Sequence, residues 1–532
     1  MLLIATHPGG AEVARTPLAQ RVEEAYASVA ESRTTRRELL KRTTAAGVAL
    51  AGASTMGRLT KAAYGASAPV RIAVVGAGLA GLTCAYRLRQ AGLRADIFEA
   101  SDHVGGRCHT DTVTFAPLVA EHGGELIDQG HTQVRQLAQE LGLTLDNLLQ
   151  AQPNGTEDFF WVNGGKYPYT QLVDDLNGIY QKMHKDVSAA SYPTLWNNYT
   201  QRGWELDHMS IIEWLDETVP NGGSKSNLGR VLDIAYNIEY GAECSEQSSL
   251  NLLYLLGYSG QGQFHIFGPS NEKYHVHGGN QQIADGLALA LDGQIATGTE
   301  LTAIKKNDTG TFTLTLREGS ATLTPDAYDH VVLALPFSLL RNVNYSKAGF
   351  EPLKVTAIKE LPMGTNSKLH VEFIDRFWYD AKNNGNTYAD TGYQNTWEVS
   401  RAQGGGKGKG LLVDYTGGKI GASFGSGTPT TRAREFISQI QPLFDEFNIT
   451  VSDHWSQNAT IDFWTAYPWT KGSYSYWKVG QYTKFSGMEY ARQANCHFCG
   501  EHTSQDFQGY LNGAVETGER VAGDILGDLK HT

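Results

Sequence analysis

Residues 71–99 carry the pattern that most constrains how this chain folds. The apolar run RIAVV leads directly into a G-x-G-x-x-G pattern made by Gly76, Gly78 and Gly81. Apolar residues at helical spacing follow, and a second apolar run then ends on Glu99. Strand, glycine turn, helix and strand therefore follow one another without interruption. This order predicts the first βαβ unit of a parallel sheet of the Rossmann type.

Each of these residues has a physical task in holding a nucleotide. Gly76 permits a tight turn, Gly78 lets the backbone approach a pyrophosphate, and Gly81 lets the helix pack closely on the strand. The helix N-terminus directs its free N–H groups at the phosphates. Glu99 is placed to bind the hydroxyls of a ribose, which disfavours a 2′-phosphate. The stretch therefore predicts a dinucleotide site and not merely a glycine-rich turn.

Length and composition narrow the class of protein further. A chain of 532 residues is too long for one compact core, so two or more domains are expected. The net charge of −12 argues against a nucleic-acid partner, which needs clustered Lys and Arg. Five cysteines are too few and too scattered for a disulfide framework. Cys496 and Cys499 form a C-x-x-C pair, interpreted as buried apolar fillers and not as a redox pair or half of a metal site, and no metal site is predicted.

The first 68 residues are interpreted as an N-terminal extension. Residues 34–68 place Arg36 and Arg37 ahead of a short Ala- and Gly-rich apolar stretch, and this arrangement resembles a twin-arginine export signal. The alternative is a basic helix in an N-terminal arm. The apolar stretch is too short and weak for a stable membrane anchor. Periplasmic or secreted residence after export of the folded protein is therefore expected.

Downstream of Glu99 the chain departs from a simple NAD-binding domain. Paired glycines and an arginine occur in DHVGGRCHT, and a second glycine pair occurs in VAEHGGELID. With the G-x-G-x-x-G unit, these stretches resemble the flavin-containing amine oxidase family, which includes monoamine, polyamine and L-amino acid oxidases. The resemblance implies an FAD cofactor whose pyrophosphate and ribityl chain lie along these residues: Gly106, Arg107, Gly123, Gly124 and Glu125.

Three distant stretches extend the resemblance over residues 70–530. TELTAI (299–304) resembles the strand that contacts the adenine, with Leu301 at the contacting position. VVLALPFSLL (331–340) resembles the strand and turn that return from the FAD domain. The stretch 496–526 resembles the segment that meets the ribityl and phosphate groups through Gly500 and Glu501. Its helix start, which includes Asn512, is then aimed at the flavin ring.

The resemblance implies a mixed α/β (α+β) fold with a discontinuous Rossmann-type FAD-binding domain and a substrate-binding domain of mixed sheet and helices. The FAD-binding segments are expected at 70–150, 270–345 and 475–530. The substrate-binding segments are expected at 151–269 and 346–474. Within the latter, amphipathic runs predict helices over 169–187 and 209–219, and AQGGGKGKG (402–410) predicts an exposed turn between two strands.

The chemistry of amine oxidation indicates what the substrate site needs. The flavin accepts a hydride at N5, and the amine must be neutral when it reacts, so a dry aromatic slot is required. By resemblance, Tyr474 and Tyr510 sandwich the amine, and Lys368 holds a water against the flavin and assists reoxidation by O2. Ser473 occupies the position of the family's flavin-linked cysteine, so non-covalent FAD is expected. Trp378 and the run 463–469 are candidate pocket walls, with core packing as the alternative.

Three histidines are candidates for a chemical role. His122, next to a glycine pair, is a candidate for tuning the flavin potential. His275 and His277 lie on one face of a predicted strand, and no carboxylate or cysteine partner is expected beside them. All three are interpreted as structural or supporting residues.

Several functions share this architecture. An amine oxidase yields an imine that is hydrolysed to aldehyde and ammonia, with O2 reduced to H2O2. An L-amino acid oxidase gives a 2-oxo acid and needs a cation, usually Arg, for the carboxylate. Relatives of that kind often carry an Arg two residues after the position of Gly124, where this chain has Leu126, and a Trp where this chain has Tyr510. The amine is therefore favoured, although Arg341 or Arg401 could still serve an amino acid.

Two less favoured alternatives are a flavoprotein without turnover and an enzyme that desaturates lipophilic substrates. The expected partners are a small-molecule amine or amino acid and O2. The sequence leaves the oligomeric state open, a homo-oligomer included.

Overall fold

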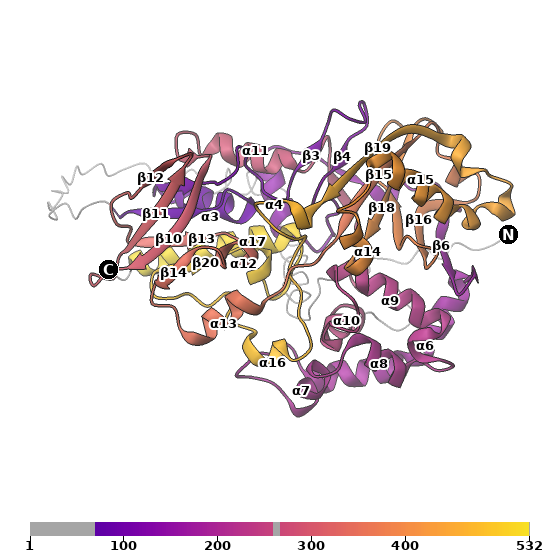
Figure 1. Cartoon of the computed structure of the whole chain (residues 1–532), viewed down its shortest axis with the longest axis horizontal. Helices are drawn as coiled ribbons and strands as arrows, with labels where there is room; N and C mark the ends of the chain where they lie inside the picture. Colours follow the sequence, from indigo (N-terminus) through magenta and orange to yellow (C-terminus); the bar gives the residue numbers. More distant parts are fainter. Residues whose placement is uncertain (1–69, 259–265, 531–532) are drawn as a thin grey trace, which may run out of the picture.

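The computed structural model describes residues 70–258 and 266–530, and a five-stranded parallel sheet lies at the centre of one half of the molecule (Figure 1). Every pair of neighbouring strands in this sheet runs parallel. The strands, in spatial order, are β20 (Cys496–Phe498), β13 (His330–Leu333), β1 (Ile72–Val75), β2 (Ala95–Phe98) and β9 (Ile295–Ala296). They come from three separate stretches of the chain, so the sheet is discontinuous in sequence.

Strand β1 is apolar throughout because both faces of the sheet are covered. Ile72 and Val74 pack against one hydrophobic layer, whereas Ala73 and Val75 pack against another. Helices α3 (Leu79–Gln90), α11 (Gln281–Ala290) and α17 (Leu511–Lys530) supply the first layer. A four-stranded sheet supplies much of the second: β12 (Ala321–Leu323), β11 (Phe312–Glu318), β10 (Thr299–Lys306) and β14 (Asn344–Lys347). Burial on both faces is typical of parallel strands.

The other half of the molecule is built on a mixed seven-stranded sheet. Its strands, in order, are β19 (Trp455–Phe463), β15 (Ser367–Phe373), β18 (Gly410–Thr416), β17 (Asn395–Glu398), β16 (Asn383–Ala389), β6 (Glu157–Val162) and β7 (Gly165–Lys166). Residues 157–166 join this sheet through the parallel pairing of β6 with β16, although more than two hundred residues separate them in sequence. Two distant stretches of the chain therefore complete one sheet.

A group of helices packs beneath the seven-stranded sheet (Figure 1). These are α6 (Tyr169–Ala190), α7 (Gln201–Asp207), α8 (Ile211–Thr218), α9 (Asn227–Tyr240) and α10 (Ser249–Leu256), and their apolar faces form one core. The remaining α-helices are α4 (Thr132–Glu140), α5 (Leu148–Ala151), α12 (Phe337–Leu340), α13 (Pro352–Glu360), α14 (Gly418–Ser423), α15 (Pro429–Ile440) and α16 (Gln481–Phe485). The remaining strands form two small sheets, β3 (Thr110–Asp111) with β4 (Ala120–Glu121) and β5 (Leu145–Asn147) with β8 (Tyr274–Val276).

The predicted fold class is confirmed: the structure is mixed α/β, with a discontinuous parallel sheet and a second mixed sheet. The helices predicted over 169–187 and 209–219 are α6 and α8, and the exposed turn at 402–410 joins β17 to β18. Cys496 and Cys499 are buried and free, as expected of apolar fillers. Within 70–258 and 266–530, no helix has the length and apolarity to cross a bilayer. The proposed twin-arginine segment lies outside the described residues.

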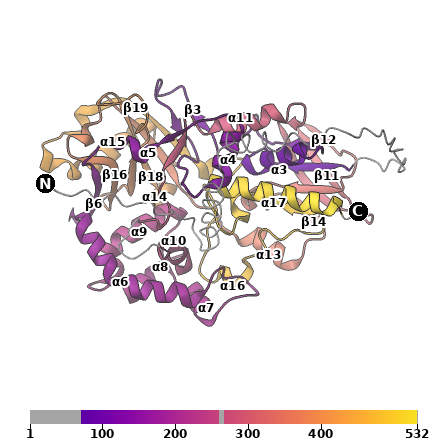
Figure 2. The same cartoon turned by 180° about the vertical axis from the view of Figure 1, so that it is seen from behind.

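The contact between α3 and α17 generates a stability prediction, and both views show these helices side by side (Figures 1 and 2). A Cβ at Gly518 would lie 2.4 Å from the Ala80 carbonyl oxygen, whereas a Cβ at Gly523 would meet nothing within 4 Å. We expect Gly518→Ala to lower the free energy of unfolding by about 1–3 kcal/mol through overpacking. Gly523→Ala on the same helix should raise it by about 0.5–1 kcal/mol, because Ala favours the helix.

Urea denaturation of the two single variants and the parent measures both effects. Equal changes at the two positions would show that the helices do not approach as closely as described.

Candidate functional site

One cavity runs along the carboxyl edge of the five-stranded sheet and continues to the seven-stranded sheet. Gly76 follows β1, Glu99 follows β2, Ala334 follows β13, and Gly500 lies two residues beyond β20, and all four line this cavity. Parallel strands deliver the residues after their carboxyl ends to one edge, which is where ligands bind in such sheets. The topology therefore gathers these distant residues at one site.

The glycine turn after β1 has the shape that a dinucleotide requires. Gly76 has a φ of +104°, and a Cβ there would lie 2.7 Å from the Ala334 carbonyl oxygen. A Cβ at Gly81 would lie 2.0 Å from the Gly76 carbonyl oxygen, so only glycine allows α3 to pack this closely. At Gly78, by contrast, the nearest atom to such a Cβ is 3.9 Å away. The three predicted tasks of these glycines are therefore consistent with their surroundings.

The N-terminus of α3 fits a phosphate. Its N-cap is Gly78, whose lack of a side chain leaves the first turn without a side-chain cap, and that turn contains no acidic residue. Gly78, Leu79 and Ala80 line the cavity. A helix N-terminus of this kind carries partial positive charge and favours an anion. Gly105 and Gly106, both with positive φ, line the same part of the cavity. The residues present fit the predicted dinucleotide.

The Glu99 carboxylate, which follows β2, is held by the glycine turn after β1 and by Ser101. One carboxylate oxygen accepts the Ala77 N–H at 2.7 Å, and the other accepts the N–H and the hydroxyl of Ser101, both at 2.8 Å. These three bonds orient the carboxylate at the cavity wall. Its predicted bond to a ribose stays a prediction.

Arg107 and Glu501 form a buried link across the middle of the cavity. The Arg107 guanidinium donates to a Glu501 carboxylate oxygen at 2.9 Å and to the Ser473 carbonyl at 2.7 Å. Burial would raise the pKa of Glu501, but the charge of Arg107 and hydrogen bonds from Arg107 and Ser475 outweigh it and lower that pKa. Glu501 also accepts the Gly509 N–H at 3.0 Å. The pair thus ties the segment after β20 to the start of α17.

Lys368 is buried at the start of β15, where its ammonium has three acceptors. It donates to the carbonyl oxygens of Glu121 and Gly123 at 2.9 Å each and to the Glu125 carboxylate at 2.8 Å. Burial would raise the pKa of Glu125, but the charge and hydrogen bond of Lys368 lower it. Both side chains line the cavity, so a charged pair joins the two halves of the molecule there.

Tyr474 and Tyr510 both line the far part of the cavity, as their predicted role requires. The Tyr474 hydroxyl contacts the Tyr415 hydroxyl at 2.7 Å and donates to the Ile238 carbonyl at 2.8 Å. The Tyr510 hydroxyl donates to the Glu239 carboxylate at 3.0 Å. The aromatic wall continues around this part through Tyr415, Trp397, Tyr388 and Phe267, whereas Tyr467, which also lines the cavity, lies beside His103 at the nucleotide end. This part of the cavity is therefore an aromatic chamber.

Two carboxylates that the sequence analysis missed lie in this chamber, Glu239 at the end of α9 and Glu272 in the loop before β8. Burial, together with the nearby carboxylates of Asp128 and Glu239, raises the pKa of Glu272 to about 8. Glu239 is the one charged residue in the helical stretch YNIEY (236–240), whose other residues are buried, and a carboxylate in that position was the available signal. Glu272 lies in a polar loop whose sequence gives no such signal.

Other predicted residues lie away from the cavity. Leu301, on β10, is buried in the core, and the Asn512 side-chain oxygen accepts the Val134 N–H at 3.0 Å; neither is among the cavity-lining residues, so their contacts with a cofactor stay predictions. Trp378 is wholly buried in the core of the seven-stranded sheet, so core packing and not a pocket wall is its role.

The histidine interpretation needs a correction. Carboxylates do lie beside the two histidines: His275 contacts Glu121 at 2.8 Å and His277 contacts Asp146 at 3.1 Å. Glu121 is contributed by β4 and Asp146 by β5, so sequence spacing around the histidines could not reveal them.

His122 lines the cavity and belongs to a buried polar group with Asp462 and His370. Its Nδ1 lies 2.7 Å from one Asp462 oxygen, and the His370 Nδ1 lies 3.6 Å from the other. Burial would raise the pKa of Asp462, but the hydrogen bond from His122 and the nearness of both histidines lower it to about 2. Burial would lower the pKa of His122, and its bond to Asp462 outweighs this and raises it.

These opposite shifts define a pH window. The contribution of Asp462 is present above about pH 4 and is lost as the pH falls through its folded pKa; that of His122 is present below about pH 6.5 and is lost as the pH rises through its raised pKa. We therefore expect Asp462→Asn to cost about 1–3 kcal/mol of unfolding free energy near pH 5.5 and clearly less at pH 9. Urea denaturation at both pH values measures this.

Asp146→Asn is the matched control, since it removes the half-buried partner of the exposed His277 and should cost at most about 1 kcal/mol. An equal loss for Asp462→Asn at both pH values would contradict the charged pair and leave only a neutral hydrogen bond.

Comparison with known proteins extends these observations. Residues 79–526 match the family described as flavin-containing amine oxidoreductase. A protein of Mycobacterium tuberculosis named as a flavin-containing monoamine oxidase is 26% identical over 483 residues, covering 88% of this chain and 99% of the relative. A Bacillus subtilis protein named as an L-amino-acid oxidase is 23% identical over 476 residues, covering 86% and 95%. A solved putrescine oxidase matches with a TM-score of 0.74 at 20% identity, covering 87% of this chain and 100% of the other.

The match spans most of the chain: it begins at the first residue of α3, directly after the glycine turn, and includes the segment after β20. The chain therefore belongs to the flavin-containing amine oxidoreductase family, which confirms the predicted FAD cofactor and the predicted oxidoreductase chemistry on amines.

Proposed function

We propose that this protein oxidises primary amines that carry a second positive charge, such as short α,ω-diamines, and uses O2 as the electron acceptor. The overall reaction converts R–CH2–NH2, O2 and water to R–CHO, NH3 and H2O2. The observation that carries the proposal is the acidic, aromatic chamber formed by Glu239, Glu272 and the surrounding tyrosines. A positive group on the substrate would complement the two carboxylates there.

The charges that line the cavity favour an amine over an amino acid. Among the described residues, its cationic side chains are Arg107 and Lys368, and each is bound to a carboxylate. An amino acid substrate needs a cation for its own carboxylate. The two arginines considered from the sequence have other partners. Arg341 donates to the carbonyls of Ile358 and Leu361, and Arg401 donates to the Asn384 carbonyl at 2.8 Å and the Asn386 amide oxygen at 3.1 Å.

The aromatic chamber supports the reaction through its low polarity. When bound, the flavin accepts the hydride from the carbon that bears the amine. Tyr474, Tyr510 and Trp464 restrict water near the reacting amine, and a poorly hydrated site favours the neutral amine over the ammonium. The distal amine of the substrate stays protonated because Glu239, and Glu272 once it is ionised, offer negative charge. The two ends of one substrate are thus held in opposite protonation states.

Lys368 and Ser473 have roles at the cofactor side. Lys368 is proposed to order a water there and to assist the reaction with O2, and its three acceptors hold the ammonium in place for this task. Ser473 supports non-covalent FAD, because a serine hydroxyl cannot form the thioether; its hydroxyl donates to Asn366 at 2.6 Å. Acid precipitation should then release the flavin into the supernatant.

Anaerobic reduction of the bound flavin tests the substrate class. We expect short diamines to bleach the oxidised-flavin absorbance faster than monoamines of equal length, and L-amino acids to leave it unchanged. Bleaching by L-amino acids alone would overturn the proposal in favour of the second candidate, an L-amino acid oxidase, which the Bacillus subtilis relative supports by name. Persistent oxidised flavin with every compound would favour a flavoprotein without turnover.

The variant Glu272→Gln tests the acidic chamber. We expect it to raise KM for a diamine about 10-fold or more at pH 9, where Glu272 is ionised, since one charge-assisted contact is worth about 1.5–3 kcal/mol, and to change KM for a monoamine much less. Because Glu272 with its raised pKa ionises near pH 8, diamine KM of the parent should fall more steeply between pH 7 and 9 than that of the variant. Glu217→Gln, at an exposed position on α8, is the control and should change neither.

We also propose export by the twin-arginine route to the periplasm or medium. The support is the sequence of residues 34–68, with Arg36 and Arg37 ahead of the apolar stretch. Recovery of the amine oxidase activity in the cytoplasmic fraction alone would refute it.

A further inference from the structure

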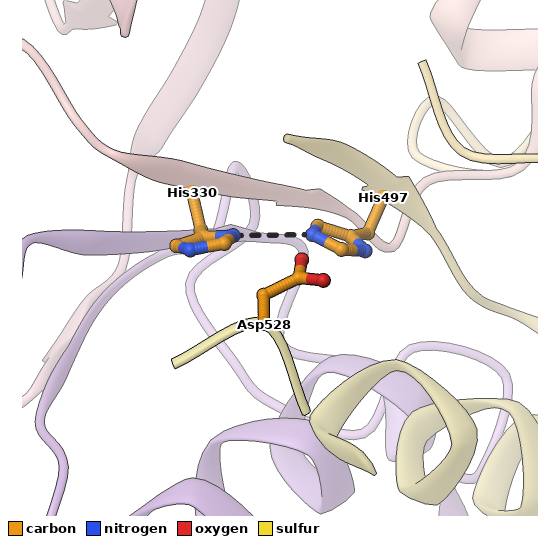
Figure 3. Close-up of side chains that lie close together, drawn as sticks. All are labelled: His330, His497 and Asp528. Atoms are coloured by element: carbon orange, nitrogen blue, oxygen red, sulfur yellow. Dashed lines mark hydrogen bonds between the residues drawn. The ribbon is translucent and has the colours of Figure 1, made fainter. Parts of the chain in front are cut away.

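Two buried histidines and a carboxylate meet on the parallel sheet, away from the cavity-lining residues. His330 begins β13, His497 lies on the neighbouring strand β20, and Asp528 lies in the last turn of α17. The His330 Nδ1 and His497 Nε2 atoms are 3.3 Å apart, and one nitrogen of each ring and one Asp528 oxygen all lie within 4.8 Å of one another. Figure 3 shows the carboxylate pointing toward the imidazole pair.

This spacing is close to what a tetrahedral zinc ion requires. With bonds of about 2.0–2.1 Å, neighbouring ligand atoms of such an ion lie about 3.3–3.4 Å apart. The two ring nitrogens already have this separation. Two imidazoles and one carboxylate are also a donor set that zinc accepts, with a fourth position open to water.

Both imidazoles are buried, and a neutral imidazole nitrogen offers a lone pair to a metal. His497 is fully buried, and its Nδ1 has no hydrogen-bond partner among the described residues.

Asp528 is oriented by Arg492, which donates to its Oδ2 at 2.6 Å. The other oxygen, Oδ1, can face the imidazoles while this ion pair is kept. Such outer contacts commonly fix the orientation of a ligating carboxylate. Its side chain is 30% exposed, so an ion can reach the buried pair from solvent past this residue.

We propose that His330, His497 and Asp528 form a site for a divalent ion of the zinc class, which ties the end of α17 to the parallel sheet. The ion would bind the two facing ring nitrogens, with their protons carried on the outer nitrogens, and one Asp528 oxygen. The ion would hold the last turn of α17 on the sheet. Because the first turn of the same helix lines the cofactor cavity, the ion would also stabilise one wall of that cavity.

Titration of the metal-stripped, FAD-bound protein with zinc chloride tests the site. We expect one tight equivalent by calorimetry, a rise in Tm that saturates at one equivalent, and no such effect of Mg2+, which disfavours imidazole ligands. Co2+ in place of zinc should give the visible absorption of a tetrahedral ion with nitrogen and oxygen ligands. Absence of a saturable equivalent, or a Co2+ spectrum of octahedral type, would overturn the proposal.

The matched variants are Asp528→Asn and Asp524→Asn, both on α17. Asp528→Asn should weaken zinc binding at least 10-fold, whereas Asp524→Asn, one turn earlier, should leave it within about 2-fold. Flavin content of each variant reports that the fold is retained. Equal affinity in both variants would place the bound zinc elsewhere, and the proposal would fail. Because the Co2+ spectrum uses the parent protein, the site is tested even where a variant loses its flavin.

Discussion

The close packing of α3 on β1 is the contact on which the rest of the structure depends. A Cβ at Gly81 would lie 2.0 Å from the Gly76 carbonyl oxygen, so the helix can approach the strand only without a side chain there. This approach sets the uncapped N-terminus of α3 at the carboxyl edge of the parallel sheet. The same edge then receives Glu99 after β2 and Gly500 beyond β20. One steric constraint thereby locates the whole nucleotide end of the cavity.

Two buried charge pairs join this nucleotide end to the rest of the molecule. Lys368 on the seven-stranded sheet binds Glu125, and Arg107 binds Glu501. Each ammonium or guanidinium also binds backbone carbonyls, so neither charge is buried without several partners. Such pairs hold their elements in one relative position because loss of either partner would leave a buried charge. Glu239 and Glu272 line the aromatic chamber apart from these two pairs.

Much of the fold was predictable from local patterns. The helical periodicity over 169–187, the buried strand before Gly76 and the exposed glycine-rich turn at 402–410 all appear where expected. The sequence missed three carboxylates for one reason: each reaches its partners from a distant part of the chain. Glu121 and Asp146 approach the two histidines from other strands. Glu272 enters the chamber from a loop. Trp378 is part of the hydrophobic core because β15 and its neighbours enclose it, and the spacing of apolar residues in the sequence does not reveal this.

The sequence by itself determined the βαβ unit and the glycine positions that suit a dinucleotide. These depend on conformational freedom and periodicity, which are properties of a few consecutive residues. Only the tertiary structure decided which charges meet. It joined residues 157–166 to a sheet made by 367–463, brought Glu239 and Glu272 into one chamber, and set His330, His497 and Asp528 together. Electrostatic interaction depends on distance in space, and no local pattern encodes the distance between residues that the fold brings together.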